Sequence, residues 1–163
     1  MQEVITPQGG KVRLQASEMY LIDDVIFEGV SLGSAFNMRH DILIEVANKA
    51  FILDTKYKQI PRFEGDHEAV RRIVAEEPKQ TDIYQVCEYA RKRNIDDVYL
   101  LYPMYRLEDE EPSFPIGVSK DHNGKREIRV HFTRLPFVFE EDNEEIVKNQ
   151  LRNIIDKIIS GGC

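Results

Sequence analysis

The chain has very little cysteine. Only Cys87 and Cys163 occur among its 163 residues. Two thiols are too few for a disulfide framework, and they also exclude a cysteine-rich metal site or an iron–sulfur cluster. Cys87 falls in the apolar stripe of an expected helix, so it is predicted to be a small buried hydrophobic residue without a catalytic role.

Long apolar runs and an excess of positive charge are also missing. No segment approaches the roughly 18 apolar residues that a membrane helix requires, and the first ten residues, MQEVITPQGG, lack the pattern of a signal peptide. We therefore expect a cytoplasmic protein with no membrane association. The net charge of −7 argues against a domain that holds nucleic acid by overall electrostatics alone.

What the sequence does contain is a succession of short strand and helix patterns. With 42% hydrophobic residues, 31% charged residues and no internal repeat, it is typical of one globular domain spanning residues 1–163. Residues 28–40, which hold two glycines and two serines, are expected to be a loop. Alternation of Ile128, Val130 and Phe132 with charged residues predicts a strand with one solvated face. Strands are predicted at 11–15, 19–27, 41–45, 50–54, 96–104, 115–119 and 126–133, and helices at 67–76, 81–93 and 140–160. This order predicts an α/β (α+β) fold with a mixed β-sheet flanked by helices.

Two acids and a lysine stand at one end of the hairpin predicted from residues 41–45 and 50–54. Asp41 opens the first strand and Asp54 closes the second, so antiparallel pairing brings them to the same end. Lys56 follows Asp54 by two positions and projects from the same face if the strand continues. A carboxylate pair and an ammonium group would then face one site.

These residue types suit phosphodiester hydrolysis. Asp41 and Asp54 can share Mg²⁺, a hard cation that prefers oxygen ligands, and the main-chain carbonyl of Thr55 is a further candidate ligand. Such an ion activates water and neutralises charge on a phosphoryl oxygen, while Lys56 would orient the water or stabilise the transition state. The alternative is an ordinary capped hairpin with a surface ion pair, because D-x-K is common by chance. Against that alternative, the charges directly abut apolar strand cores, where unpaired burial is costly.

Two polar residues of the second predicted helix are candidates for the border of this site. Gln85 and Tyr89 are four positions apart and share a helix face, offset from the apolar stripe. We expect Gln85 to contact DNA or Lys56, and Tyr89 to contact a phosphate. The alternative is that both merely cap the edge of the core. His40, next to Asp41, is expected to be exposed to solvent, and the alternative is that it touches a phosphate.

The segments HDILIE (40–45) and FILDTKYK (51–58), followed by DIYQVCEYA and VYLLYP, resemble a known nuclease family. They are similar to the PD-(D/E)xK nucleases, and specifically to the McrC nuclease subunit of the McrBC modification-dependent restriction system. QVCEY matches the Q-x-x-x-Y pattern of the RecB-like branch. The resemblance extends over roughly residues 38–104, and His40 stands where the family usually has proline.

The resemblance implies a restriction-endonuclease-like core and a DNA endonuclease of a prokaryotic restriction system. By its motifs, Asp41 and Asp54 would bind Mg²⁺ (or Mn²⁺) together with Thr55, Lys56 would be the catalytic lysine, and Gln85 and Tyr89 would border the site. The implied partners are DNA and an McrB-like AAA+ GTPase that reads the modified base. Two alternatives stay open, namely an autonomous RecB-like repair nuclease and a non-catalytic assembly module that keeps the fold.

Overall fold

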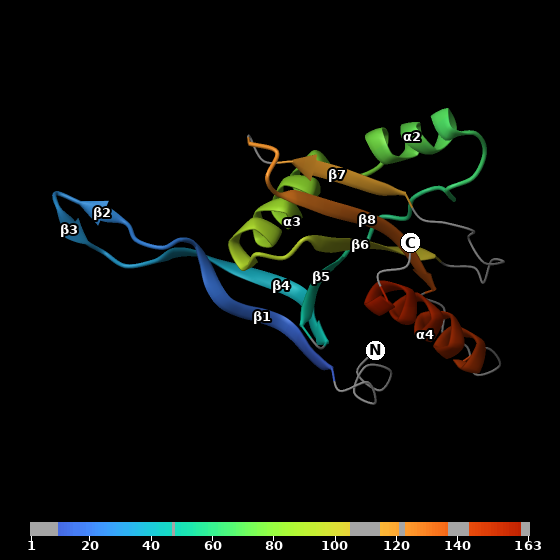
Figure 1. The fold of residues 1–163 in the computed structure, drawn as a ribbon, viewed down its shortest axis with the longest axis horizontal. Coiled ribbons are helices and arrows are strands. Elements are labelled where there is room, and N and C mark those ends of the chain that lie inside the picture. Colours follow the sequence, from blue (N-terminus) through green and yellow to red (C-terminus); the bar gives the residue numbers. More distant parts are fainter. Residues whose placement is uncertain (1–9, 47, 105–114, 121–122, 137–143, 161–163) are drawn as a thin grey trace.

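A computed structural model describes residues 10–46, 48–104, 115–120, 123–136 and 144–160. Over these ranges the chain forms a mixed β-sheet with helices on both faces and a hairpin arm that projects from one side (Figure 1). Within the same ranges, no helix combines the length and the apolar character needed to cross a membrane.

Six strands build the main sheet, and two of its contacts are parallel. The strands are β1 (Lys11–Ile22), β4 (Ala35–Val46), β5 (Lys49–Thr55), β6 (Asp97–Met104), β7 (Ile116–Lys120) and β8 (Glu127–Pro136). Their spatial order is β1-β4-β5-β6-β8-β7. β5 runs parallel to β6 and β6 parallel to β8, whereas the contacts β1–β4, β4–β5 and β7–β8 are antiparallel. The predicted mixed sheet is confirmed.

Three helices are described: α2 (His67–Glu76), α3 (Gln80–Arg93) and α4 (Glu144–Ser160). The bounds predicted for α2 are confirmed, and Asp66 caps it by accepting a hydrogen bond from the Ala69 N–H at 2.8 Å. α3 ends where Asn94 adopts the left-handed conformation. The first four residues predicted for the last helix, 140–143, lie outside the described residues.

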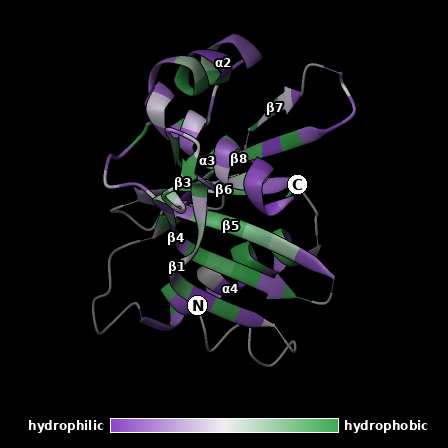
Figure 2. Cartoon of the chain, turned by 90° about the vertical axis from the view of Figure 1, so that its left-hand side faces the viewer, coloured by the Kyte–Doolittle hydropathy of each residue, from purple (hydrophilic) through white to green (hydrophobic). Residues whose placement is uncertain are grey.

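The apolar core lies on both faces of the sheet, which gives a three-layer arrangement. On one face, Val86, Cys87 and Ala90 of α3 pack against sheet residues such as Ile52 and Leu100. On the other face, Ile155 and Ile158 of α4 pack against neighbours that include Leu53 and Leu101. β5 and β6 are therefore buried on both sides, as near-continuous apolar strands require, and Figure 2 shows the hydrophobic band along β5.

The N-terminal strands extend further than the sequence indicates. Residues 28–40 were expected to be a loop, but β4 begins at Ala35 and pairs with β1 up to Ile22. Beyond that pair, β2 (Ile26–Phe27) and β3 (Val30–Ser31) form a short ribbon. Main-chain pairing between β1 and β4 thus outweighs the turn-forming composition. We call residues 20–36 the N-terminal arm; many of its large apolar side chains, such as Phe27 and Phe36, are exposed.

Candidate active site at the carboxyl ends of β5 and β6

The β4–β5 hairpin brings Asp41 and Asp54 to the same end of the sheet. Ile42 pairs with Leu53, so the two acids occupy the next position on each strand. Asp41 Oδ2 accepts hydrogen bonds from the Thr55 N–H at 2.9 Å and from the Thr55 hydroxyl at 2.6 Å. The Asp41 carboxylate therefore ties the end of β5 to the start of the buried part of β4.

Lys56 faces Asp54, and it also faces an acid that the sequence did not single out. The Lys56 ammonium forms an ion pair with Asp54 and lies 3.2 Å from Asp82 Oδ1 on α3. All three side chains are largely withdrawn from solvent, with 7% exposure for Asp54, 13% for Lys56 and 22% for Asp82. Asp82 reaches Lys56 only through the packing of α3 on the sheet, so the sequence pattern gave no signal for it.

The positive charge of Lys56 does not fully offset the cost of burying the negative charge of Asp54. Burial raises the pKa of Asp54 against the opposing effect of Lys56, and the negative charges of Asp41 and Asp82 add to the rise. For Lys56, burial alone would lower the pKa, but Asp54 and Asp82 outweigh it and raise the pKa. Lys56 is therefore charged at neutral pH, and the site still carries more negative than positive charge.

A pocket of about 380 Å³ opens over these residues. Asp41, Asp54, Thr55 and Lys56 form part of its lining. Lys58 and Lys79 line it as well and give it a positive rim, although Lys58 also pairs with Glu77 at 2.6 Å. At its floor, the buried hydroxyl of Tyr102 has no hydrogen-bond partner among the described residues. Burial raises the pKa of Tyr102, and the nearby Asp82 and Asp54 raise it further.

The two polar residues expected at the border of the site do not line this pocket. Gln85 Nε2 donates a hydrogen bond to the Tyr89 hydroxyl at 2.8 Å, and Gln85 is exposed. Tyr89 packs edge-on against His40 with the ring centroids 4.5 Å apart. Tyr89 thus reaches the strand segment that carries Asp41, but neither Gln85 nor Tyr89 touches Lys56 through a hydrogen bond recorded for the described residues.

The expectation that His40 is exposed was wrong, because its side chain is completely buried. The Arg93 Nε–H donates to His40 Nε2, and the ring lies against Tyr89. Burial lowers the pKa of His40 to about 4, with Arg93 contributing in the same direction. His40 is therefore a neutral core residue that anchors β4 to α3.

The oxygen donors at this strand end fit a hydrated divalent cation. Two carboxylates, Asp41 and Asp54, stand beside the main chain of Thr55, and the excess of negative charge favours a cation there. The described residues contain no group of three or more His, Cys, Asp and Glu side chains arranged to hold a metal. A site of two carboxylates suits Mg²⁺ or Mn²⁺, which keep several water ligands, and does not suit a closed zinc site.

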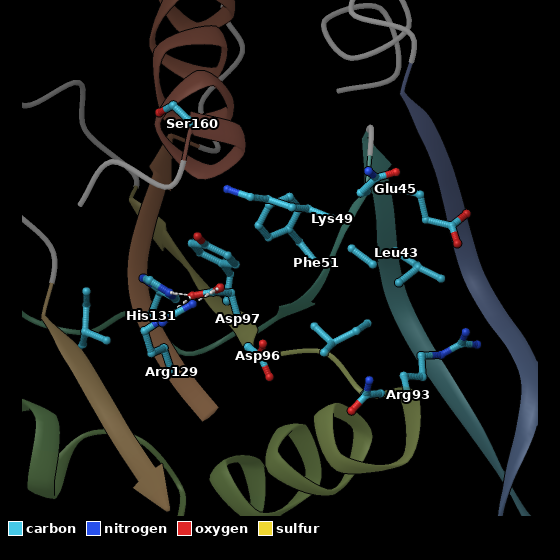
Figure 3. A pocket seen from close by; sticks show the side chains of 16 residues that line it. Leu43, Glu45, Lys49, Phe51, Arg93, Asp96, Asp97, Arg129, His131 and Ser160 are labelled. Carbon is cyan, nitrogen blue, oxygen red and sulfur yellow. Dashed lines mark hydrogen bonds and ion pairs between the residues drawn. The ribbon is translucent and has the colours of Figure 1, made fainter. Parts of the chain in front are cut away.

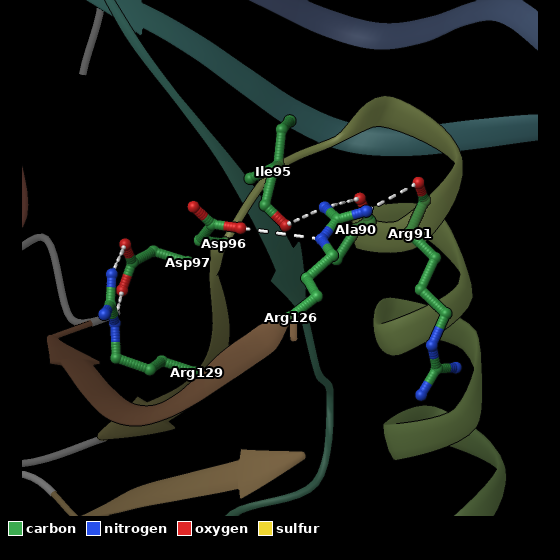
Figure 4. A network of polar contacts seen from close by, with 7 residues as sticks. All are labelled: Ala90, Arg91, Ile95, Asp96, Asp97, Arg126 and Arg129. Atoms are coloured by element: carbon green, nitrogen blue, oxygen red, sulfur yellow. Dashed lines mark hydrogen bonds and ion pairs between the residues drawn. The ribbon is translucent and has the colours of Figure 1, made fainter. Parts of the chain in front are cut away.

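A larger pocket of about 640 Å³ lies at the opposite ends of the same strands (Figure 3). Its polar centre is Asp97, which receives two hydrogen bonds from Arg129 at 2.7 and 2.6 Å and contacts His131 Nε2 at 2.8 Å. Figure 4 shows the adjoining network, in which Arg126 donates to the main-chain oxygens of Ala90, Arg91 and Ile95. Arg126 thus ties the residue before β8 to the end of α3, while Asp97 with Arg129 and His131 joins β6 to β8.

Comparison with known proteins identifies the family to which the chain belongs. The chain matches the family described as the McrBC 5-methylcytosine restriction system component over residues 3–103, which is more than half of its length and includes the candidate active site. No curated protein matches the chain. The protein therefore belongs to the family of McrBC 5-methylcytosine restriction system components.

Proposed function

We propose that this protein is a Mg²⁺-dependent DNA endonuclease of the PD-(D/E)xK type that acts as the cleavage subunit, or its nuclease domain, of a modification-dependent restriction system. The observation that carries the proposal is the meeting of Asp41 of β4 with Asp54 and Lys56, at the carboxyl end of β5, in one pocket. Membership of the McrBC family supports the restriction context.

Each residue has a distinct role in this proposal. Asp41 and Asp54, with the main-chain carbonyl of Thr55, would hold the cation, with Mn²⁺ as an alternative to Mg²⁺. When bound, the cation supplies a more acidic water and neutralises charge on the scissile phosphate. The ammonium of Lys56, which lines the pocket, would orient the attacking water or stabilise the developing negative charge.

The surroundings of the pocket support an anionic substrate. Lys58 and Lys79 line it, and Tyr57, whose exposed fraction is 96%, stands next to them. Lysines at a rim bind phosphates without reading sequence. Because the whole chain carries a net charge of −7, we propose that an McrB-like AAA+ GTPase partner recognises the modified cytosine and holds the DNA while this protein cuts it.

Calorimetric titration with Mg²⁺ and with Mn²⁺, combined with plasmid nicking in the same samples, tests the proposal. Wild type is compared with Asp54→Ala and with Asp97→Ala, a matched removal of a carboxylate from the opposite end of the strands. We expect cation binding and nicking in wild type, loss of both in Asp54→Ala, and retention of both by the folded fraction of Asp97→Ala. Binding without nicking would direct the experiment to the complex with the GTPase partner, where the same variants must reproduce this pattern. Absence of cation binding in wild type would contradict the proposed nuclease site.

A further inference from the structure

Lys56 is held by two carboxylates that come from different layers of the fold. Asp54 lies in β5, two positions before Lys56, whereas Asp82 lies in the first turn of α3, on the helix that covers this face of the sheet. The ammonium therefore sits between the sheet and the helix. A lysine that needed only a partner for burial would be satisfied by Asp54 alone, so the second carboxylate requires its own explanation.

The first carboxylate has two competing tasks. In the proposed function Asp54 is a ligand of a divalent cation, but here it is also the ion-pair partner of Lys56. An ammonium group in contact with Asp54 repels a divalent cation that approaches the same oxygens, and the repulsion is strong at a site that is largely withdrawn from water. Cation binding thus requires the ammonium to move away from Asp54 without leaving the pocket.

We propose that Asp82 is a positioning residue that takes over the Lys56 ammonium when a divalent cation occupies Asp41 and Asp54. The inference rests on the proposed metal site. Asp82 already lies 3.2 Å from the ammonium, so the transfer requires a small change of the lysine side chain and no movement of the backbone. The helix fixes where Asp82 stands, and Lys56 stays beside the reacting phosphate.

Asp82 also has a purely structural explanation, which the experiment must separate from the proposed role. An acid in the first turn of a helix interacts favourably with the helix dipole and stabilises the helix. That stabilisation would change the unfolding midpoint of a variant. It would not make the cation affinity of the variant depend on whether residue 56 is a lysine.

A double-mutant cycle on Mn²⁺ affinity tests the role of Asp82 without any measurement of cleavage. Free Mn²⁺ is quantified by electron paramagnetic resonance in wild type, Asp82→Asn, Lys56→Met and the double variant. We expect Asp82→Asn to weaken Mn²⁺ binding roughly tenfold when Lys56 is present and less than about threefold when it is replaced by methionine. Lys56→Met alone should tighten Mn²⁺ binding, because no ammonium then competes for Asp54.

A matched control separates this coupling from a general loss of negative charge. Glu77 lines the same pocket and pairs with Lys58, so Glu77→Gln removes one negative charge without touching Lys56. We expect it to change the Mn²⁺ affinity less than about threefold. Asp82→Glu, which keeps a carboxylate within reach of Lys56, should restore most of the affinity lost in Asp82→Asn.

Two results would overturn the inference, and they are distinguishable. If Asp82→Asn weakens Mn²⁺ binding equally in the lysine and methionine backgrounds, Asp82 acts only as a nearby charge and the proposed metal site stands. If wild type binds no Mn²⁺ at all, the metal site of the proposed function fails and the role of Asp82 fails with it.

Discussion

Asp54 and Asp97 are two acids at opposite ends of the central strands, and their surroundings shift their pKa values in opposite directions. Asp97 is matched by the forked guanidinium of Arg129 and by His131. Burial alone would raise the pKa of Asp97, but these hydrogen bonds outweigh it and hold the pKa well below its usual range. Asp54 is more deeply buried, and its pKa is raised because Lys56 does not offset burial and the neighbouring acids.

The opposite pKa shifts indicate that the charge of Asp97 stabilises the fold, whereas the charge of Asp54 would be stabilised by a bound cation. A carboxylate with three contacts from cationic or polar partners gains stability from its charge. A buried carboxylate with a raised pKa and two acidic neighbours carries an electrostatic cost, and such costs concentrate at functional sites. The acid of the larger pocket is thus matched by its partners, whereas the smaller pocket over Asp54 is the candidate active site.

The largest expected effect is the loss of DNA nicking in Asp54→Asn, because Asp54 is the acid assigned to the candidate active site. Removal of the negative charge takes away a cation ligand, so we expect the rate of plasmid nicking to fall about a thousandfold. Asp97→Asn should leave the rate of the folded protein within about threefold of wild type. Equal losses of rate in the two variants would contradict the assignment of the site to the carboxyl ends of β5 and β6.

The second-largest effect is on the free energy of unfolding, and here the loss is expected in Asp97→Asn and not in Asp54→Asn. Asp97→Asn should lower the free energy of unfolding by about 2–3 kcal/mol, because Arg129 loses its forked partner and the buried His131 loses its contact. Urea unfolding measures this value. A loss below about 0.5 kcal/mol would show that the network contributes nothing beyond a surface ion pair.

A smaller effect is expected on the stability of Asp54→Asn, and its sign is reversed. Asparagine removes the cost of burying a charge next to Asp41 and Asp82, so the free energy of unfolding should rise by about 1 kcal/mol. The measurement is urea unfolding in the absence of divalent cations. A decrease would mean that the ion pair with Lys56 stabilises the fold more than the charge destabilises it.

The pH dependence of stability should differ in sign between the two acids. The folded pKa of Asp97 is lowered, so its contribution is present above the ordinary value of 3.8 and is lost as the pH falls through the folded value. The folded pKa of Asp54 is raised, so its cost is present above that raised value and is relieved as the pH falls toward 3.8. Urea midpoints measured from pH 7 to pH 3 should therefore show the advantage of wild type over Asp97→Asn shrinking with acid. The deficit of wild type relative to Asp54→Asn should shrink as well.

The smallest effect is expected for Gln85→Ala. Gln85 is exposed, and its hydrogen bond to Tyr89 is its only side-chain bond recorded for the described residues, so the free energy of unfolding should change by less than about 0.5 kcal/mol. If Gln85 nevertheless contacts bound DNA, nicking will slow in this variant without a change in Mn²⁺ affinity. Tyr89→Phe, which removes the same hydrogen bond from the other side, is the matched control.

Local patterns in the sequence predicted the parts of the site that local structure builds. The 13-residue spacing of Asp41 and Asp54 belongs to one hairpin, and the cap at Asp66 fixes the start of α2, so both could be placed from neighbouring residues alone. Asp82 was missed because it reaches Lys56 only through the packing of α3 on the sheet. Sequence periodicity does not contain that contact.

Contacts between residues distant in sequence also explain two errors in the predicted fold. Alternation in β8 predicted a solvated face, but His131 on that face is buried by stacking against Tyr99, with the ring centroids 4.2 Å apart, and by its contact with Asp97. Residues 28–40 contain turn-forming residues, yet those from Ala35 onward become strand because β1 supplies hydrogen-bond partners. In both cases partners distant in sequence decided the outcome.

The parallel pairing of β5 with β6 has a consequence for the order in which the site forms during folding. Asp41 and Asp54 meet across a short hairpin, whereas the paired residues of β5 and β6 are more than forty positions apart in the chain. Closing that long loop costs entropy before its contacts form, and non-local pairing of this kind slows folding. We therefore expect the carboxylate pair, which a short hairpin joins, to form before β5 pairs with β6.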